Sequence, residues 1–219
     1  ELKNKGIDII GLSLGEPDFN TPEFIKEAAI NAVNENWNSY SPVDGYADLK
    51  EAICEKFKRD NNLDYKPSQV VVSTGAKQSI ANLCLVLLDP GDEVLLPAPY
   101  WVSYSAIATL AEATSTIIPS SIKNDFKITP EQLEAAITPK TKLIMFNSPN
   151  NPSGTVYTEA EYRALGQVLI KHPNIYILSD EIYEHINYGI SHFSIAAIPE
   201  LYDRTITVNG LAKAFAMTG

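Results

Sequence analysis

Lys213 is a single cation in a stretch of small and apolar residues near the end of the chain, in the sequence VNGLAKAFAMTG. An amine in apolar surroundings loses its proton more readily than in water, and it can then attack a carbonyl carbon to form an imine. The alternative is a lysine whose aliphatic stem packs on the protein while its ammonium reaches solvent. Lys213 is therefore the first candidate for covalent chemistry.

Asp180 follows an apolar run at 175–178, and Tyr183 stands three residues further along. A carboxylate at the edge of a low-dielectric region needs a cationic partner, or its pKa rises. The cationic ring nitrogen of a ligand is one such partner. The alternatives are that Asp180 caps a helix and that Tyr183 is a packed aromatic residue with its hydroxyl at the surface.

Three further positions suit ligand binding. Gly75 and Ala76 stand between a predicted strand and a predicted helix, where free N–H groups and the helix dipole favour an anion. Trp101 offers a ring for stacking, and Asn151 offers an amide in a proline-rich loop. Their structural alternatives are a tight turn, a core tryptophan and a turn-forming asparagine. Neither G-x-G-x-x-G nor G-x-x-x-x-G-K-[ST] occurs, so the anion would not be a dinucleotide or ATP held in those modes.

Together these residue types describe a site for pyridoxal 5′-phosphate. They supply an imine-forming lysine, a carboxylate for the pyridinium nitrogen, a hydroxyl and an amide for the phenolic oxygen, a stacking indole and a phosphate cradle. The sequence lacks the residue patterns that competing chemistries require. The histidines at 172, 185 and 192 match no metal-binding pattern, and no G-x-S-x-G motif is present. We therefore expect this cofactor and no metal.

Short apolar runs that alternate with helical patterns must position these residues. We expect strands at 69–73, 93–96, 114–118, 142–146, 175–178 and 205–208. We expect helices at 47–59, 76–87, 102–111, 130–137 and 159–171, and another that begins with Thr21 as its side-chain cap and Pro22 at its first position. This alternation is typical of an α/β fold with a mostly parallel sheet between two helical layers, a three-layer α/β/α arrangement. Ligands bind at the carboxyl ends of such strands, where the candidates fall.

Composition narrows the class of protein. The chain has 219 residues and a formal net charge of -10, which would repel a nucleic-acid backbone. It has no apolar run near the ~20 residues of a membrane span and no signal peptide at its start, so we expect no membrane association. Two cysteines in apolar patterns suggest no disulfide framework. A cytoplasmic enzyme fits best.

Seven stretches make the chain resemble the class-I aminotransferases of pyridoxal-phosphate fold type I, and closely the bacterial aspartate and aspartate/prephenate subgroup. They follow the family's order over nearly the whole chain: LSLGEPDF, YSPVDGYADLKEAI, STGAKQSIANL, LLDPGDEVLLPAPYWVSY, NSPNNPSG, LSDEIYEHI and VNGLAKAFAMTG.

The resemblance implies a role for each candidate. Lys213 would hold the cofactor as an internal aldimine and then shuttle a proton between the substrate α-carbon and C4′. Asp180 would keep the pyridine nitrogen protonated. Asn151 and Tyr183 would hydrogen-bond the 3′ oxygen, and Trp101 would stack on the ring and border the substrate, as Asn151 also would.

Further roles concern the phosphate, the partner subunit and the substrate. The amides of Gly75 and Ala76 would hold the phosphate, and Tyr40 would reach the phosphate of the neighbouring subunit in a homodimer. Lys77 would contact the distal carboxylate of an acidic substrate, with a solvated lysine as the alternative. The backbone of Gly15 would lie over the substrate's α-carboxylate.

The resemblance also implies a division of the chain. Residues 1–23 would belong to a small domain and residues 24–219 to an incomplete large, cofactor-binding domain. Many relatives carry a hydroxyl residue just before the lysine or three positions before it, where this chain has Ala212 and Gly210. The chain ends at Gly219, before the two arginines that the family uses for the phosphate and the α-carboxylate. We therefore expect these 219 residues alone to be inactive.

The expected reaction is transamination of aspartate, with glutamate and 2-oxoglutarate as the partner pair, by a ping-pong mechanism. Two alternatives within the fold are an aromatic or broad-specificity aminotransferase and a carbon–sulfur β-lyase. A non-catalytic binding domain is the alternative from another class. The sequence leaves open the keto-acid partner, the acceptance of prephenate, and cofactor binding by these residues alone.

Overall fold

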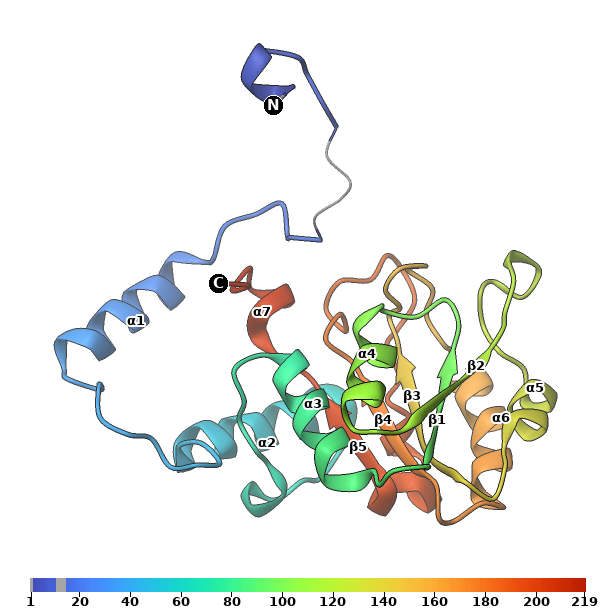
Figure 1. Ribbon diagram of the computed structural model, residues 1–219. Coiled ribbons are helices and arrows are strands. Elements are labelled where there is room, and N and C mark those ends of the chain that lie inside the picture. The colour runs from blue at the N-terminus through green and yellow to red at the C-terminus, as the bar shows by residue number, and fades with distance from the viewer. Residues whose placement is uncertain (1, 11–14) are drawn as a thin grey trace.

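The computed structural model describes residues 2–10 and 15–219, and it shows a sheet covered by helices on both faces (Figure 1). The strands are β1 (Glu93–Pro97), β2 (Thr114–Ile118), β3 (Thr141–Asn147), β4 (Tyr176–Asp180) and β5 (Thr205–Val208). They pair in the order β2-β1-β3-β4-β5, and every pairing is parallel. The three-layer α/β/α fold expected from the sequence is confirmed.

Helices precede, connect and follow the strands. The α-helices are α1 (Glu23–Asn34), α2 (Ala47–Asn61), α3 (Ala76–Leu87), α4 (Ser103–Leu110), α5 (Pro130–Ala136), α6 (Glu159–Ile170) and α7 (Leu211–Ala214). Short 3-10 helices are η1 (Lys3–Lys5), η2 (Pro67–Gln69), η3 (Ile122–Asn124), η4 (Ile195–Ala197) and η5 (Pro199–Arg204). Among the described residues, no helix combines the length and apolar character needed to cross a bilayer.

Alternation along the strands divides the core into two layers. Val94 and Leu96 of β1 face the layer of α3 and α4, where Ile80 and Cys84 are buried. Leu95, between them, faces the layer of α5 and α6, where Leu133 is buried. Because successive side chains of a strand point to opposite faces, apolar runs such as these must be covered on both sides.

One expected strand is wrong. Residues 70–73 form no strand, and the side chain of Val71 is 69% exposed rather than buried. The main chain there donates two hydrogen bonds, from Val70 to the carbonyl of Pro67 and from Val72 to the carbonyl of Asp44, and neither acceptor lies in a strand. A β-branched run marks a segment that can be extended, but a strand also needs a neighbour to pair with, and none of the described strands lies beside this segment.

The start of α1 also differs from expectation. Thr21 does not cap the helix, because its hydroxyl donates to the carbonyl of Ala216, 2.7 Å away. Figure 1 shows α1 extending away from the sheet, and none of its residues is buried. The first 23 residues include positions outside the described residues, among them the first three of LSLGEPDF. Their assignment to a small domain therefore stays a prediction.

Arg204, the last residue of η5, binds main-chain carbonyls at the C-terminal end of α6 and just after it. Its guanidinium donates to the carbonyls of Leu169, His172 and Ile175 at 2.6 to 2.9 Å. The last carbonyls of a helix have no partner within the helix, so a fixed fork of donors satisfies several at once.

We expect Arg204→Ala to lower the free energy of unfolding by about 2–3 kcal/mol, because three partly buried carbonyls lose a charged donor. Arg163→Ala is the control, since Arg163 is half exposed, pairs with Glu159 on α6 and lies 5.7 Å from the centre of the Phe193 ring, so its loss should cost less than about 1 kcal/mol. Urea unfolding of both variants measures the difference. Equal losses in the two variants would show that the Arg204 contacts contribute little.

Candidate functional site

The carboxyl ends of three neighbouring strands, β3, β4 and β5, lie side by side. Asn147 of β3 pairs with Asp180 of β4, which pairs with Val208 of β5. The side chain of Asn147 spans the first two strands: its Nδ2 donates to the carbonyl of Asp180 at 3.0 Å, and its Oδ1 accepts from the amide of Asn151 at 2.7 Å. The sheet therefore fixes where each following loop begins.

Asp180 is a buried carboxylate at this edge, with an exposed fraction of 3%. Oδ2 accepts a hydrogen bond from Oη of Tyr104 at 2.5 Å, and Oδ1 accepts one from the amide of Ile182 at 3.2 Å. No ion pair joins it to another described residue. Burial raises the pKa of Asp180 to about 6, against the opposing effect of the Tyr104 hydrogen bond. Of the two possibilities that the sequence left open, a cationic partner or a raised pKa, the described residues give the second, and the bond from Ile182 shows that the carboxylate also caps the turn that follows.

Lys213, Tyr183 and Asn151 meet on the same rim. Nδ2 of Asn151 donates to Oη of Tyr183 at 3.4 Å, and Nζ of Lys213 lies 6.0 Å from the centre of the Tyr183 ring. Nζ of Lys213 also donates to the carbonyl of Gly15 at 2.7 Å, which brings the N-terminal segment to this site. Residues from β3, β4, β5 and the N-terminal segment thus converge.

Gly75 and Ala76 form the open end of α3. Gly75 has a φ of +85°, which suits glycine, and an added Cβ there would meet no atom within 4 Å. No side chain caps the helix. The Gly75 amide donates to the carbonyl of Ser73 at 2.8 Å, so of the two amides expected to hold a phosphate, only that of Ala76 remains at the open end in this structure.

Lys77 and Trp101 are also brought together. Nζ of Lys77 lies 4.9 Å from the centre of the Trp101 ring, and the edge of that ring meets Tyr104 at 5.5 Å between ring centres. Tyr104 in turn donates to Asp180. A series of contacts therefore links the first turn of α3 to the buried carboxylate. Tyr40 is the exception among the candidates, because its side chain is fully exposed and the structure shows no side-chain contact between it and the described residues of this rim.

Sequence reasoning missed Tyr104 and Asn147. Tyr104 lies three residues after Trp101, the spacing that places two side chains on one face of a helix. Asn147 is the first polar residue after the apolar part of β3. Both features are present in the sequence, but neither a tyrosine nor an asparagine by itself indicates that its partner would be Asp180.

The arrangement suits one kind of ligand. A buried carboxylate without a cation favours a positively charged group near Asp180, and the open end of α3 favours an anion. An amine, a phenol and an amide lie between these two points. A planar cationic ring that carries a phosphate and an electrophilic carbon would satisfy all of them.

Comparison with known proteins shows what the chain is similar to. The family model for aminotransferase class I and II matches residues 7–219. The aspartate/prephenate aminotransferase of Cereibacter sphaeroides is 52% identical over 221 residues, which cover all of this chain and 55% of that protein. The aspartate aminotransferase of Bacillus subtilis is 51% identical, with 56% of it covered. The crystal structure of the aspartate aminotransferase from Rhizobium meliloti has a TM-score of 0.96 and 47% identity, with 100% and 55% of the two chains covered. The chain spans about half the length of these relatives.

The buried carboxylate of Asp180 should make the free energy of unfolding of the full-length protein without ligand depend on pH. Its pKa is raised by folding, so its contribution to stability is present below the unfolded pKa near 3.8 and is lost as the pH rises through about 6. Relative to Asp180→Asn, we expect the wild type to lose about 2–3 kcal/mol between pH 4 and pH 7. Urea unfolding at both pH values measures this.

Asp44→Asn is the control for sign. The pKa of Asp44 is lowered by its hydrogen bond with Lys50 at the surface, so its contribution should grow with pH and be small. A difference between the wild type and Asp180→Asn that does not change with pH would mean that Asp180 is not an uncompensated buried acid.

Proposed function

The chain belongs to the class I and II aminotransferases, and from that premise we propose that the protein moves the amino group of aspartate to a keto acid with pyridoxal 5′-phosphate as cofactor. A single observation carries the proposal. Asp180 is buried and meets no cation among the described residues, and it lies at the rim where Lys213, Tyr183 and Asn151 meet. 2-Oxoglutarate is the proposed acceptor, with glutamate as its product, in a ping-pong cycle. Relatives named for prephenate make that compound a second acceptor to assay.

The residues present fit the proposed cofactor. The raised pKa of Asp180 is the mark of a carboxylate that lacks a cation, and a protonated pyridine nitrogen is such a cation. The free space at Gly75 and the uncapped end of α3 suit a phosphate. When bound, pyridoxal phosphate supplies an aldehyde that condenses with amines and a ring that withdraws electrons from the substrate α-carbon.

Each side chain then has a proposed task. Lys213 would hold the cofactor at its aldehyde carbon and would move the proton at the substrate α-carbon. Asp180 would keep a proton on the ring nitrogen. Tyr183 and Asn151 would hold the phenolic oxygen with the hydroxyl and amide that already meet. Trp101 would stack on the ring.

Substrate binding would use the other side of the rim. Lys77, at the first turn of α3, is proposed to contact the distal carboxylate of aspartate, and its neighbour Trp101 would shield that contact from water. The backbone of Gly15 would lie over the α-carboxylate, with Asn151 beside it. The contact between Gly15 and Lys213 supports a place for this segment in the site.

Assembly, location and domain division are further proposals. We propose a homodimer in which Tyr40 reaches the phosphate of the second subunit; its fully exposed side chain supports a role outside its own rim. Residues 1–23 would form part of a small domain and residues 24–219 part of a large one. The acidic composition and the two free cysteines support a cytoplasmic protein.

We expect Lys213→Ala to abolish covalent capture of the cofactor in the full-length protein. Without Nζ no bond to the aldehyde carbon forms, so borohydride reduction of the wild type should add the mass of the cofactor to the peptide that contains Lys213, and the variant should stay unmodified. The control is Lys171→Ala, which removes an exposed lysine paired with Glu134 and should be modified like the wild type. Modification of Lys213→Ala to the same extent would assign the chemistry to another lysine.

We expect Lys77→Met to raise the KM for aspartate about tenfold to a hundredfold, because a charged hydrogen bond to the distal carboxylate is lost. The KM for alanine or phenylalanine should change little. Lys142→Met is the matched control, since Lys142 also lies against an aromatic ring, that of Tyr176, but at the opposite end of the sheet. An equal effect on all substrates would contradict a contact with the distal carboxylate. Preferred turnover of phenylalanine would favour an aromatic aminotransferase, and pyruvate released without an acceptor would favour a β-lyase.

A further inference from the structure

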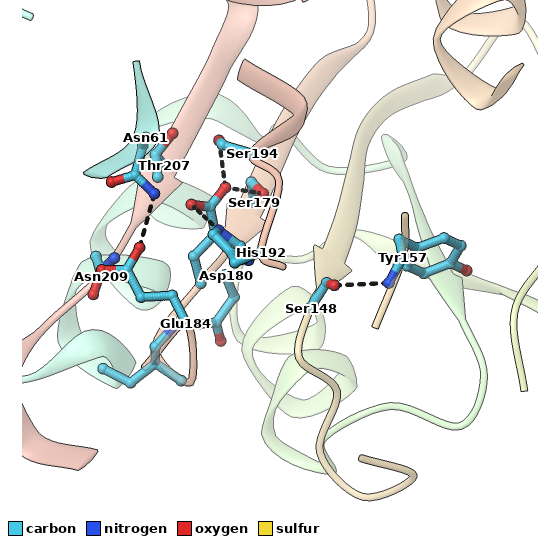
Figure 2. Close-up of polar contacts among 12 residues, drawn as sticks. Asn61, Ser148, Tyr157, Ser179, Asp180, Glu184, His192, Ser194, Thr207 and Asn209 are labelled. Atoms are coloured by element: carbon cyan, nitrogen blue, oxygen red, sulfur yellow. Dashed lines mark hydrogen bonds and ion pairs between the residues drawn. The ribbon is translucent and has the colours of Figure 1, made fainter. Parts of the chain in front are cut away.

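Glu181 is a buried carboxylate that the proposed reaction does not use. It follows Asp180 directly, and its exposed fraction is 1%. Its Oε1 accepts hydrogen bonds from Oγ of Ser179 at 2.8 Å and from Oγ of Ser194 at 2.5 Å, and its Oε2 lies 2.9 Å from Nε2 of His192. Figure 2 shows Ser179, Ser194 and His192 gathered at one place. These contacts cross from β4 to the segment before η4.

Glu181 and Asp180 point to opposite faces of the sheet. Asp180 meets Tyr104 of α4 on one face, and Glu181 meets Ser194, at the start of η4, on the other. Glu181 is the first residue after β4, and its amide still bonds to β5, so the alternation of the strand extends to it. Any tilt of the main chain at Glu181 must therefore turn the carboxylate of Asp180 as well.

The main chain of Glu181 is also the junction between the sheet and the turn that carries Tyr183. Its amide donates to the carbonyl of Val208 at 2.8 Å, and its carbonyl accepts from the amide of Glu184 at 3.0 Å. The first bond continues the pairing of β4 with β5. The second closes the turn, so the position of Tyr183 depends on that of Glu181.

Glu184 holds the other end of the same turn. Its buried carboxylate accepts a hydrogen bond from Nδ2 of Asn61 at 2.8 Å (Figure 2). It also contacts the ammonium of Lys56, and Nε2 of His185 lies 2.8 Å away. Burial acts to raise the pKa of Glu184, but the hydrogen bonds from Lys56 and Asn61 outweigh it, and the pKa is lowered. The turn is thus fastened at both ends by carboxylates whose hydrogen-bonding partners lie outside it.

Metal binding is the other use of such groups. Glu181, Glu184 and His192 offer ligand atoms within 4.8 Å of one another. The oxygens of Glu181 already accept from two hydroxyls and face an imidazole, and Glu184 already faces an ammonium. Hydrogen bonding within the protein therefore accounts for both carboxylates.

We propose that Glu181 is a positioning residue: through its three hydrogen-bonding contacts it sets the angle at which Asp180 and Tyr183 face the cofactor, and it touches neither cofactor nor substrate. Ser194 and His192 act through it, as the groups that hold its carboxylate in place. The inference rests on the proposed function, because it concerns the orientation of two groups that would bind pyridoxal phosphate.

The test compares Glu181→Ala with Glu181→Gln in the full-length protein. Alanine leaves three buried polar groups without their acceptor, so the Kd for pyridoxal phosphate should rise about tenfold or more and the circular dichroism of the bound cofactor should fall. The kcat should drop with the KM for aspartate nearly unchanged. Glutamine keeps an oxygen for both serines, and it should restore the cofactor Kd to within about threefold of the wild type.

Leu133→Ala is the control for general loss of stability, because Leu133 is fully buried on α5 on the same face of the sheet and lies outside the turn. Its cofactor Kd and dichroism should match those of the wild type. If Glu181→Ala does not fold, Ser194→Ala and His192→Ala, which each remove one contact, take its place and should weaken cofactor binding in the same direction.

The outcomes separate the two proposals. A wild type that binds pyridoxal phosphate while these variants bind it equally well, with unchanged dichroism, would refute the positioning role alone. An effect of Leu133→Ala equal to that of Glu181→Ala would also refute it, since stability would then account for both. A wild type that binds no pyridoxal phosphate would refute the proposed function, and the positioning role with it.

Discussion

The burial of Asp180 without a cationic partner is the constraint on which the rest of the site depends. Burying a charge is costly unless an opposite charge meets it, and the cost appears here as a pKa of about 6. Among residues 2–10 and 15–219, the carboxylate accepts hydrogen bonds only from the phenol of Tyr104 and the amide of Ile182. Those two hydrogen bonds orient the carboxylate, but no described residue compensates its charge, so the site favours a ligand that brings a cation.

The parallel sheet makes that burial possible and also places the other groups. Because β3, β4 and β5 end in register, the residues that follow each strand start from the same edge. Asn151, Tyr183 and Lys213 come from three such loops, which lie far apart in sequence. Chemistry that needs an amine, a phenol and an acid around one ring is thus assembled from short local segments.

The two acids at the end of β4 face opposite sides of the sheet and have different proposed roles, one in chemistry and the other in orientation. Asp180 faces the site, whereas Glu181 faces the helical layer beneath it and is tied to Ser179, Ser194 and His192. A buried acid held by several neighbours is rigid, and rigidity is what a neighbouring functional group requires. The hydrogen-bonding contacts of Glu181 therefore hold the main chain next to Asp180 in place, although the charge of Asp180 meets no cation among the described residues.

The sequence by itself determined the elements and the candidate residues, and only the tertiary structure decided their partners. The strands at 114–118 and 205–208 agree with the structure residue for residue, because β-branched runs between turn signals are local. The segment at 69–73 has the same local signal, yet it forms no strand, because pairing is not local. Likewise Lys213 and Asp180 could be chosen by type and setting, whereas Tyr104, Asn147 and Glu181 gain their roles from contacts across the fold. A hydrogen bond depends on distance and direction between groups, and these exist only once the chain has folded.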